Sequence, residues 1–237
     1  MPADEPRQAA EALVARRLTG TPVPRVLEAG CGARSHLAYP TGARVAGVDI
    51  LRSQLTRHEG TRALAQGDVT ALPVATASQD LVVCWDVLEH LPAPDRALAE
   101  IGRVLRPGGL AVLALPNITS LKGLVTRLTP WWFHVWVYRR VLGDRSAGTD
   151  ASDQFPTAFR FSLRPSRLAS LARDRHLDVD HLWLYEGPVP RHLRRRHRAA
   201  DVALRVAGAV SRTLSAGRYD TTLSDMVVVA TRRSDGR

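Results

Sequence analysis

The sequence predicts an α/β fold in which a mostly parallel sheet is covered by helices on both faces. Apolar runs of strand length alternate with helical stretches through residues 23–117. These runs are apolar along most of their length, which is typical of strands that are buried on both sides. With 237 residues, the chain can bury a full core, and we expect one domain over residues 1–237.

The segment from Arg25 to Asp49 is the most informative part of the chain. An apolar run that contains Glu28 passes into a turn with Gly30 and Gly32, and a second apolar run ends at Asp49. This pattern predicts a strand, a tight glycine turn, a short helix and a second strand with a carboxylate at its tip. Such glycines let the backbone approach a ligand, and a carboxylate about 20 residues further on accepts hydrogen bonds from ribose hydroxyls. The first hypothesis is therefore a nucleoside-type cofactor.

A nicotinamide or flavin dinucleotide is the competing cofactor. Its fingerprint has a third small residue that packs the helix against the strand. Residues 30–35 read Gly-Cys-Gly-Ala-Arg-Ser, so Ser35 stands at that third position and the match is incomplete. A dinucleotide-dependent oxidoreductase stays open as an alternative at this point.

The following elements are expected in a regular order. A helical stretch over residues 51–58 leads to a strand that ends near Asp68, and residues 80–91 form a buried strand that runs into a turn. Asp95 is expected to cap a helix through Leu105, and a strand follows over residues 110–115. The carboxyl ends of parallel strands meet at one edge of a sheet, where ligands bind. Candidate ligand groups at these ends are Glu28, Asp49, Asp68, Trp85, Asp86 and Asn117.

Four segments in this order resemble a known family. They read VLEAGCG, AGVDI, GDV and DLVVCWDVLEHLPAPDRALAEIGRVLRPGGLAVLALPN, and end at residue 117. The succession resembles the class I S-adenosylmethionine-dependent methyltransferases, especially the small-molecule branch that includes the quinone-biosynthesis enzymes. The resemblance covers residues 23–117 and, more loosely, 158–185 and 221–233. It implies a Rossmann-like, seven-stranded, mostly parallel sheet with an antiparallel last strand.

The resemblance also implies a set of positions that bind S-adenosylmethionine. Glu28 would lie near the methionine amino group, Asp49 would hold the ribose hydroxyls, and Asp68 would accept from the adenine amine. The turn through Asp86 would face the transferred methyl group. The family usually has a third glycine two positions after Gly32, where this chain has an arginine. The full implied set is Glu28, Gly30, Cys31, Gly32, Asp49, Ile50, Asp68, Val69, Cys84 and Trp85.

An acceptor oxygen or nitrogen must lose a proton on methylation, and a positioned base accelerates this step. The candidates for that base are His90, His134 and Asp86. We expect Cys31 and Cys84 to be small buried side chains rather than reactive thiols. The histidines show no spacing suited to a metal, so no metal site is expected.

Residues 118–162 form an insertion at the place where a substrate lid belongs. Thr129 as N-cap, Pro130 at the first position and Gly143 as terminator predict a helix rich in tryptophan. A hydrophobic lid over an apolar acceptor, an anchor at a membrane interface and a helix of the core all stay open. Residues 150–161 are expected to complete the lid. The candidate acceptor-binding residues are Asn117, Trp132, Trp136 and Tyr138.

The net charge of +10 is concentrated towards the C-terminal part of the chain. The segment Arg191–Arg198 leads into a stretch with apolar residues at helical spacing, which predicts an amphipathic helix. Three readings stay open: a solvated helix beside the sheet, contact with anionic lipid or an acidic partner, and recognition of a phosphorylated substrate. No aromatic residues are interleaved with these arginines, so nucleic acid is not an expected partner.

The N-terminal residues show no apolar stretch typical of a signal peptide, and two cysteines do not make a disulfide framework. We therefore expect a cytoplasmic enzyme, at most peripheral to a membrane. The predicted function is S-adenosylmethionine-dependent methylation of a small hydrophobic molecule, on oxygen. The alternative is a non-catalytic module of the same fold that docks a membrane or partner. The sequence leaves the oligomeric state open.

Overall fold

The computed structural model describes residues 5–61, 63–140, 143, 148, 158 and 160–234. They contain a seven-stranded sheet in the order β3-β2-β1-β4-β5-β7-β6. The strands from β3 to β5 pair in parallel, and β7 is antiparallel to both of its neighbours. The strands are β1 Arg25–Ala29, β2 Arg44–Asp49, β3 Ala63–Gln66, β4 Gln79–Trp85, β5 Leu105–Pro116, β6 Leu177–Tyr185 and β7 Asp225–Arg232. The predicted fold class is confirmed, including the antiparallel last strand β7, which lies second from the edge of the sheet.

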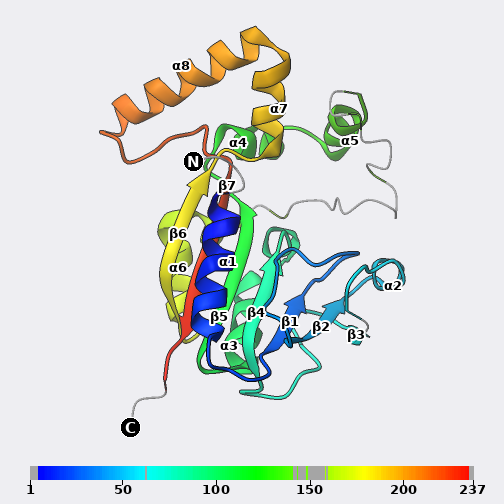
Figure 1. Ribbon diagram of the computed structural model, residues 1–237. Helices are drawn as coiled ribbons and strands as arrows, with labels where there is room; N and C mark the ends of the chain where they lie inside the picture. Colours follow the sequence, from blue (N-terminus) through cyan, green and yellow to red (C-terminus); the bar gives the residue numbers. More distant parts are fainter. Residues whose placement is uncertain are drawn as a thin grey trace.

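Helices cover both faces of this sheet (Figure 1). On one face, α1 contributes Ala10, Val14 and Leu18 to a core cluster with alternate residues of the central strands. On the other face, α3 and α6 pack against the remaining strand residues. The helices are α1 Glu5–Leu18, α2 Arg52–Leu55, α3 Pro94–Val104, α4 Leu121–Leu128, α5 Trp131–Arg140, α6 Pro165–Arg173, α7 Pro188–Arg196 and α8 Arg198–Leu214, with short 3-10 turns at Leu88–His90 and Phe161–Leu163.

The short helix predicted between the glycine turn and the second strand is absent, so that prediction was wrong. The crossover between β1 and β2 is an irregular loop. Pro40 has no N–H and disfavours a helical conformation at Tyr39, and Gly42 has a positive φ of 86°. Side chains hold the loop instead: Ser35 and Tyr39 both donate to the carboxylate of Glu28.

Two other boundaries differ from the prediction. The helix expected over residues 51–58 is the single turn α2, and β5 begins at Leu105, well before the predicted start. Asp95 is not the N-cap of α3: that position is Ala93, and no side chain caps the helix. Pro94 at the first position of α3 has no N–H, which leaves one fewer unpaired donor at the start of the helix. Asp95 instead pairs with Arg175, at 3.4 Å.

Thr129 ends one helix rather than beginning the next. It is the C-cap of α4, and its hydroxyl donates to the carbonyl of Val125. The aromatic helix α5 follows directly at Trp131. Residues 141 and 142, next to the predicted terminator Gly143, and most of the loop predicted over 150–161 lie outside the described residues.

The amphipathic stretch after residue 190 forms two helices instead of one. The backbone at His197 is extended, with φ −134° and ψ 111°, and separates α7 from α8. The arginine cluster thus belongs mainly to α7, whereas the apolar periodicity belongs to α8.

Truncating the core of the sheet should destabilise the protein strongly. Leu113 on β5 has no exposed surface, so Leu113→Ala should lower the free energy of unfolding by about 2–5 kcal/mol through lost burial and the cavity left behind. Leu128→Ala is the control, because that side chain is 73% exposed. Urea denaturation would measure both variants, and equal effects would contradict the described core.

Candidate active site

The glycine turn after β1 is fastened to the end of β2. The N–H groups of Gly30 and Cys31 donate to the carbonyl of Val48, at N···O distances of 2.7 and 3.1 Å. Gly30 has a φ of +76°, and a Cβ built there would lie 2.3 Å from the side chain of Val87. Because both the backbone conformation and the space exclude a side chain, this position requires glycine.

Asp49 closes the same turn from the tip of β2. Its two carboxylate oxygens accept from the N–H of Gly32 at 2.9 Å and from the N–H of Leu51 at 2.8 Å. Each oxygen keeps a further lone pair, so the carboxylate can also accept from two neighbouring hydroxyls. Ile50 beside it is 61% exposed and offers an apolar contact. These features fit a ribose and an adjoining base.

Glu28 lies buried at the centre of the loop contacts, 2% exposed. Ser35 Oγ donates to its Oε2 at 3.0 Å, and the hydroxyl of Tyr39 donates to its Oε1. Burial, followed by the negative charge of Glu28, raises the pKa of Tyr39, so the phenol stays protonated and keeps donating. Glu28 therefore orders the loop over the turn as well as presenting a carboxylate there.

His58 belongs to this site, although the sequence analysis did not single it out. Its Nδ1 lies 3.0 Å from the carbonyl oxygen of Gly32. Its buried Nε2 lies 3.8 Å from the carboxylate of Glu28 and has no hydrogen-bond partner among the residues that the structure describes. An unpaired buried nitrogen beside the carboxylate is suited to a polar ligand group at this point. No spacing in the sequence marks His58.

Asp68 and Val69 follow β3 at the same edge of the sheet. Asp68 is exposed, and its carboxylate accepts from the N–H of Thr70 at 2.7 Å. Val69 is 6% exposed and packs into the core. The carboxylate of Asp68 is therefore the more accessible of the two groups predicted to meet an adenine.

Both cysteines are buried thiols. Burial, followed by the charges of Asp49 and Glu28, raises the pKa of Cys31 to about 12. Burial also raises the pKa of Cys84, which is completely inaccessible. The predicted filler role is therefore borne out, and the Cys84 side chain offers no surface for the methionine contact expected of it.

The end of β4 carries Trp85 and Asp86. The indole of Trp85 stacks on the ring of His36, with 5.5 Å between ring centroids, so the crossover loop leans against this strand end. Asp86 has a positive φ of 53°, and its N–H donates to the carbonyl of Ala114. The strained backbone turns Asp86 out of the strand while the hydrogen bond keeps it at the sheet edge.

An ion pair near Asp86 consists of Lys122 and Asp225, two residues for which the sequence predicted no role. Lys122 Nζ lies 2.8 Å from Asp225 Oδ1, and the hydroxyl of Ser224 donates to the other carboxylate oxygen. Burial lowers the pKa of Lys122, but the charge and hydrogen bond of Asp225 outweigh it and hold the pKa above its usual value. Lys122 is the only lysine among 33 basic residues, which is the one signal the sequence offered.

Burial and the charge of Asp225 raise the pKa of Asp86 to about 6, although Lys122 opposes the shift. Burial and the charge of Asp86 likewise hold the pKa of Glu89 well above its usual range. Near neutral pH, Asp86 is thus mostly an ionised carboxylate that readily takes up a proton. A carboxylate with this pKa is suited to accept a proton from a ligand.

The other residues predicted to act on the acceptor side contact neighbouring groups of the protein. Asn117 is used internally: its side chain donates to the carbonyl of Leu223 and accepts from Thr119. His134 Nε2 lies 3.0 Å from the hydroxyl of Thr129. His90 lies beside Glu89, with 3.8 Å between Nε2 and Oε1.

The aromatic helix α5 contributes exposed rings and one group near Lys122. Trp132 and Trp136 are 68% and 51% exposed. Tyr138 is close enough to Lys122 to affect its pKa. Of the predicted acceptor residues on α5, Tyr138 therefore lies towards Lys122, whereas the two tryptophans are exposed.

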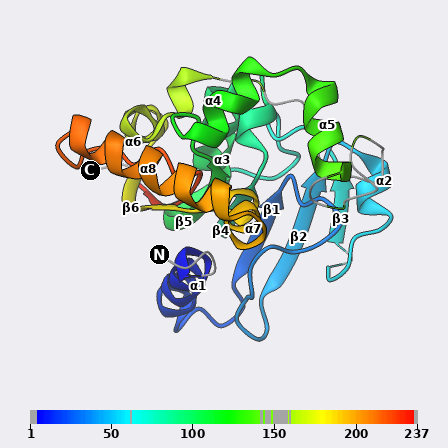
Figure 2. The same cartoon turned by 90° about the horizontal axis from the view of Figure 1, so that it is seen from above.

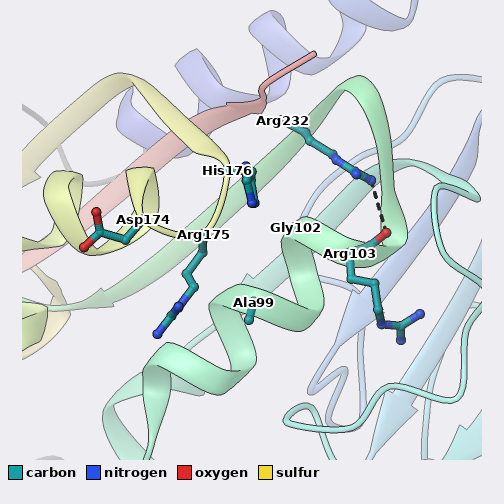
Figure 3. Close-up of a pocket in the computed structure, with 7 residues that line it drawn as sticks. All are labelled: Ala99, Gly102, Arg103, Asp174, Arg175, His176 and Arg232. Carbon is teal, nitrogen blue, oxygen red and sulfur yellow. Dashed lines mark hydrogen bonds between the residues drawn. The ribbon is translucent and has the colours of Figure 1, made fainter. Parts of the chain in front are cut away.

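A cavity of about 240 Å³ lies away from this edge, between the ends of α3, α6 and β7 (Figure 3). Its arginines are engaged by the protein: Arg103 binds Glu100, Arg175 binds Asp95, and Arg232 donates to main-chain carbonyls. This cavity is therefore a packing feature. It is lined by Ala99, Gly102, Arg103, Asp174, Arg175, His176 and Arg232.

Within the described residues, no group of three or more potential metal ligands occurs. None of the described helices combines the length and the apolar content that a membrane crossing requires.

Comparison with known proteins identifies the domain. The methyltransferase-domain family matches residues 27–113. A probable S-adenosylmethionine-dependent methyltransferase of Mycolicibacterium smegmatis is 36% identical over 116 residues, 45% of this chain and 44% of that protein. A protein of the same description from Mycobacterium tuberculosis is 30% identical over 197 residues, 78% of this chain and 61% of that one. The ubiquinone biosynthesis O-methyltransferase of Bordetella bronchiseptica is 28% identical over 164 residues, 65% of this chain and 62% of that one. The chain thus spans between 44% and 62% of these relatives.

Solved structures share the fold across most of the chain. The YcgJ protein of Bacillus subtilis superposes with a TM-score of 0.57 at 18% identity, covering 97% of this chain and all of that one (100%). The Haemonchus contortus phosphoethanolamine N-methyltransferase 2, solved with S-adenosyl-L-methionine, superposes with a TM-score of 0.53 at 16% identity, covering 89% and 49%. At these identities the solved structures show the shared fold. The matched domain and the sequence relatives support a class I S-adenosylmethionine-dependent methyltransferase domain, whose cofactor is S-adenosylmethionine.

Proposed function

We propose that this protein transfers the methyl group of S-adenosylmethionine to a hydroxyl oxygen of a small hydrophobic molecule. The observation that carries the proposal is the polar cluster at the sheet edge. There, Asp86, with a pKa of about 6, stands near the Lys122–Asp225 ion pair, one strand away from the glycine turn. A base beside a cation is suited to deprotonate a hydroxyl and to stabilise the resulting oxyanion.

Residues around the glycine turn would hold the cofactor. Asp49 would accept from the ribose hydroxyls with the lone pairs that Gly32 and Leu51 leave free. Ile50 would lie against the adenine, and Asp68 would accept from its amine. Glu28 would meet the methionine amino group, with the unpaired Nε2 of His58 beside it. When bound, S-adenosylmethionine supplies an activated methyl group on a sulfonium.

At the acceptor side, the chain moves one proton and excludes water. Asp86 takes the proton from the acceptor hydroxyl, and Lys122 stabilises the oxygen that loses it. Asp225 keeps Lys122 charged and in place. Alignment of the acceptor in a dry site can contribute about 7–11 kcal/mol to the lowering of the barrier.

Residues 118–162 act as the acceptor-binding insertion in this proposal, beside a cofactor-binding half over 23–117 and a C-terminal part over 163–237. Two contacts support it. The N–H of Ala158 donates to the carbonyl of Glu89 at 2.7 Å, and Tyr138 on α5 lies near Lys122. The insertion therefore leaves the sheet edge with α4 and returns to it beside Asp86.

Oxygen is favoured over nitrogen as the acceptor atom because a neighbouring cation stabilises a developing oxyanion but repels a developing ammonium. The Bordetella relative is named as an O-methyltransferase, which agrees with this choice. A panel of apolar phenols incubated with methyl-labelled S-adenosylmethionine tests the proposal. Labelled ethers support it, whereas transfer to amines alone would contradict it.

Peripheral contact through Arg191–Arg198, with anionic lipid or an acidic partner, is a second proposal. The segment is only partly available, because Arg194 pairs with Glu186 at 2.5 Å and with Asp201 at 3.0 Å. The neighbouring Arg195, Arg196 and Arg198 are exposed. The non-catalytic alternative needs this contact without the cofactor, and the intact set of Glu28, Gly30 and Asp49 argues against it.

Removal of the Asp49 carboxylate should weaken cofactor binding. Asp49→Ala should raise the dissociation constant of S-adenosylmethionine at least about tenfold, because hydrogen bonds to a charged acceptor contribute about 1.5–3 kcal/mol each. Equilibrium dialysis with labelled cofactor measures this change. Asp178→Ala, a carboxylate that is 47% exposed on β6, is the control. Unchanged affinity in Asp49→Ala would contradict the site.

The ionisation of Asp86 should depend on Lys122. A carboxyl ¹³C titration by NMR should give Asp86 a pKa of about 6, above that of an ordinary aspartate. Lys122→Met removes a nearby positive charge that favours the ionised form, so the midpoint should move to higher pH. Lys122→Arg keeps the charge and should restore most of the midpoint. An Asp86 midpoint in the ordinary range would remove its assignment as the base.

The exposed tryptophans of α5 should matter for turnover and not for the cofactor. Trp132→Ala combined with Trp136→Ala should leave S-adenosylmethionine binding intact and lower methyl transfer to an apolar acceptor at least about tenfold. Tyr219→Ala, an aromatic residue 56% exposed outside the insertion, controls for general surface effects. If cofactor affinity falls instead, α5 belongs to the cofactor site or core.

A further inference from the structure

The helix α8 presents its large apolar side chains to solvent. Val202, Val206, Val210 and Leu214 are 60%, 56%, 50% and 83% exposed. They recur every four residues, so they lie along one face of the helix. A surface helix normally turns such a stripe towards the core. We call these four residues the apolar stripe.

The opposite face of α8 is held to the body by small and polar residues. A Cβ at Gly208 would lie 3.0 Å from Thr222, so the backbone packs closely there. The hydroxyl of Ser211 accepts from the N–H of Thr221 at 3.2 Å. Asp201 binds Arg194 of α7. These contacts fix the helix with the apolar stripe outwards, so the orientation does not depend on burial of the stripe.

Arginines border the apolar stripe on one side. Arg198, Arg205 and Arg212 are seven residues apart, which places them in a line along the helix. The side chains of Arg205 and Arg212 are 73% and 51% exposed, although each pairs with an aspartate. An exposed apolar face bordered by cations on a chain of net charge +10 is the pattern of a helix that lies in an anionic membrane interface.

Exposed apolar side chains also occur on the helices beside the acceptor edge. Leu128 of α4 and Trp132 of α5 are 73% and 68% exposed. Figures 1 and 2 show α4, α5, α7 and α8 together at the end of the molecule where the parallel strands have their carboxyl ends. Tryptophan is favoured where an apolar phase meets water. The acceptor edge therefore lies at the same end as these surfaces.

We propose that this end of the protein docks on an anionic lipid surface, with the apolar stripe in the interface and the arginines against the headgroups. The 17 residues of α8 make a helix about 25 Å long, which lies along the surface. Docking would bring the acceptor edge next to the phase in which a hydrophobic molecule dissolves. The inference stands on α8 alone and does not require methyl transfer.

A second copy of the chain is a less suitable occupant of the apolar stripe. A symmetric dimer brings the same face of both copies together. Antiparallel α8 helices would then bring the arginine lines, spaced alike on each copy, to the same interface. Like charges at an interface oppose association. An anionic lipid surface instead supplies the opposite charge to every arginine.

Vesicle sedimentation tests the proposal with the full chain. The protein should sediment with phosphatidylcholine vesicles that contain phosphatidylglycerol, and much less with phosphatidylcholine alone. Val202→Ser combined with Val206→Ser and Val210→Ser should lower the partition coefficient at least about tenfold, because apolar burial in the interface is lost. Added salt should also weaken binding by screening the arginines.

The matched control is a single valine-to-serine substitution outside α8. Val206→Ser is compared with Val23→Ser, since Val23 is 44% exposed just before β1, away from α8. Circular dichroism and cofactor binding should match the wild type in all variants. Absence of sedimentation, or sedimentation unaffected by the stripe substitutions, would overturn the proposal. A concentration-dependent dimer that dissociates when the same residues are substituted would also overturn it, because the apolar stripe would then bind a second copy of the chain.

Discussion

The hydrogen bonds between the glycine turn after β1 and the end of β2 are the constraint on which the site depends. They fix Gly30 and Cys31 to Val48, and the carboxylate of Asp49 then closes the turn on the N–H of Gly32. A side chain at Gly30 would collide with Val87, so the turn can exist only with glycine there. The loop that follows contains no helix, and it is held by the hydrogen bonds that Ser35 and Tyr39 donate to Glu28.

Two groups of polar residues lie along one edge of the sheet, at the carboxyl ends of the parallel strands. The ends of β1 and β2 carry the groups suited to a nucleoside, and the ends of β4, β5 and β7 carry Asp86 and the Lys122–Asp225 pair. Because β1 and β4 are neighbours, the two groups of residues lie side by side. The antiparallel β7 matters here, since its direction brings Asp225 rather than its last residue to this edge.

Local patterns in the sequence predict that Glu28, Gly30 and Asp49 meet at one sheet edge, because they lie within one strand–turn–strand unit. The acceptor side depends on contacts between distant segments: Lys122 and Asp225 are 103 positions apart, and no local pattern joins them. His58 lies after α2 and meets Gly32 and Glu28 through contacts that are distant in the sequence. Periodicity shows that α8 is amphipathic, but the direction of its apolar face follows from Gly208, Ser211 and Asp201, whose partners are tertiary.

Titration calorimetry of the wild-type protein with S-adenosylmethionine and S-adenosylhomocysteine tests the central claim most directly. The site around Asp49 contacts parts that both ligands share, so both should bind one site per chain with dissociation constants in the micromolar range. Failure of both ligands to bind a protein with an intact unfolding transition would contradict the assignment of the glycine turn and Asp49 as a cofactor site.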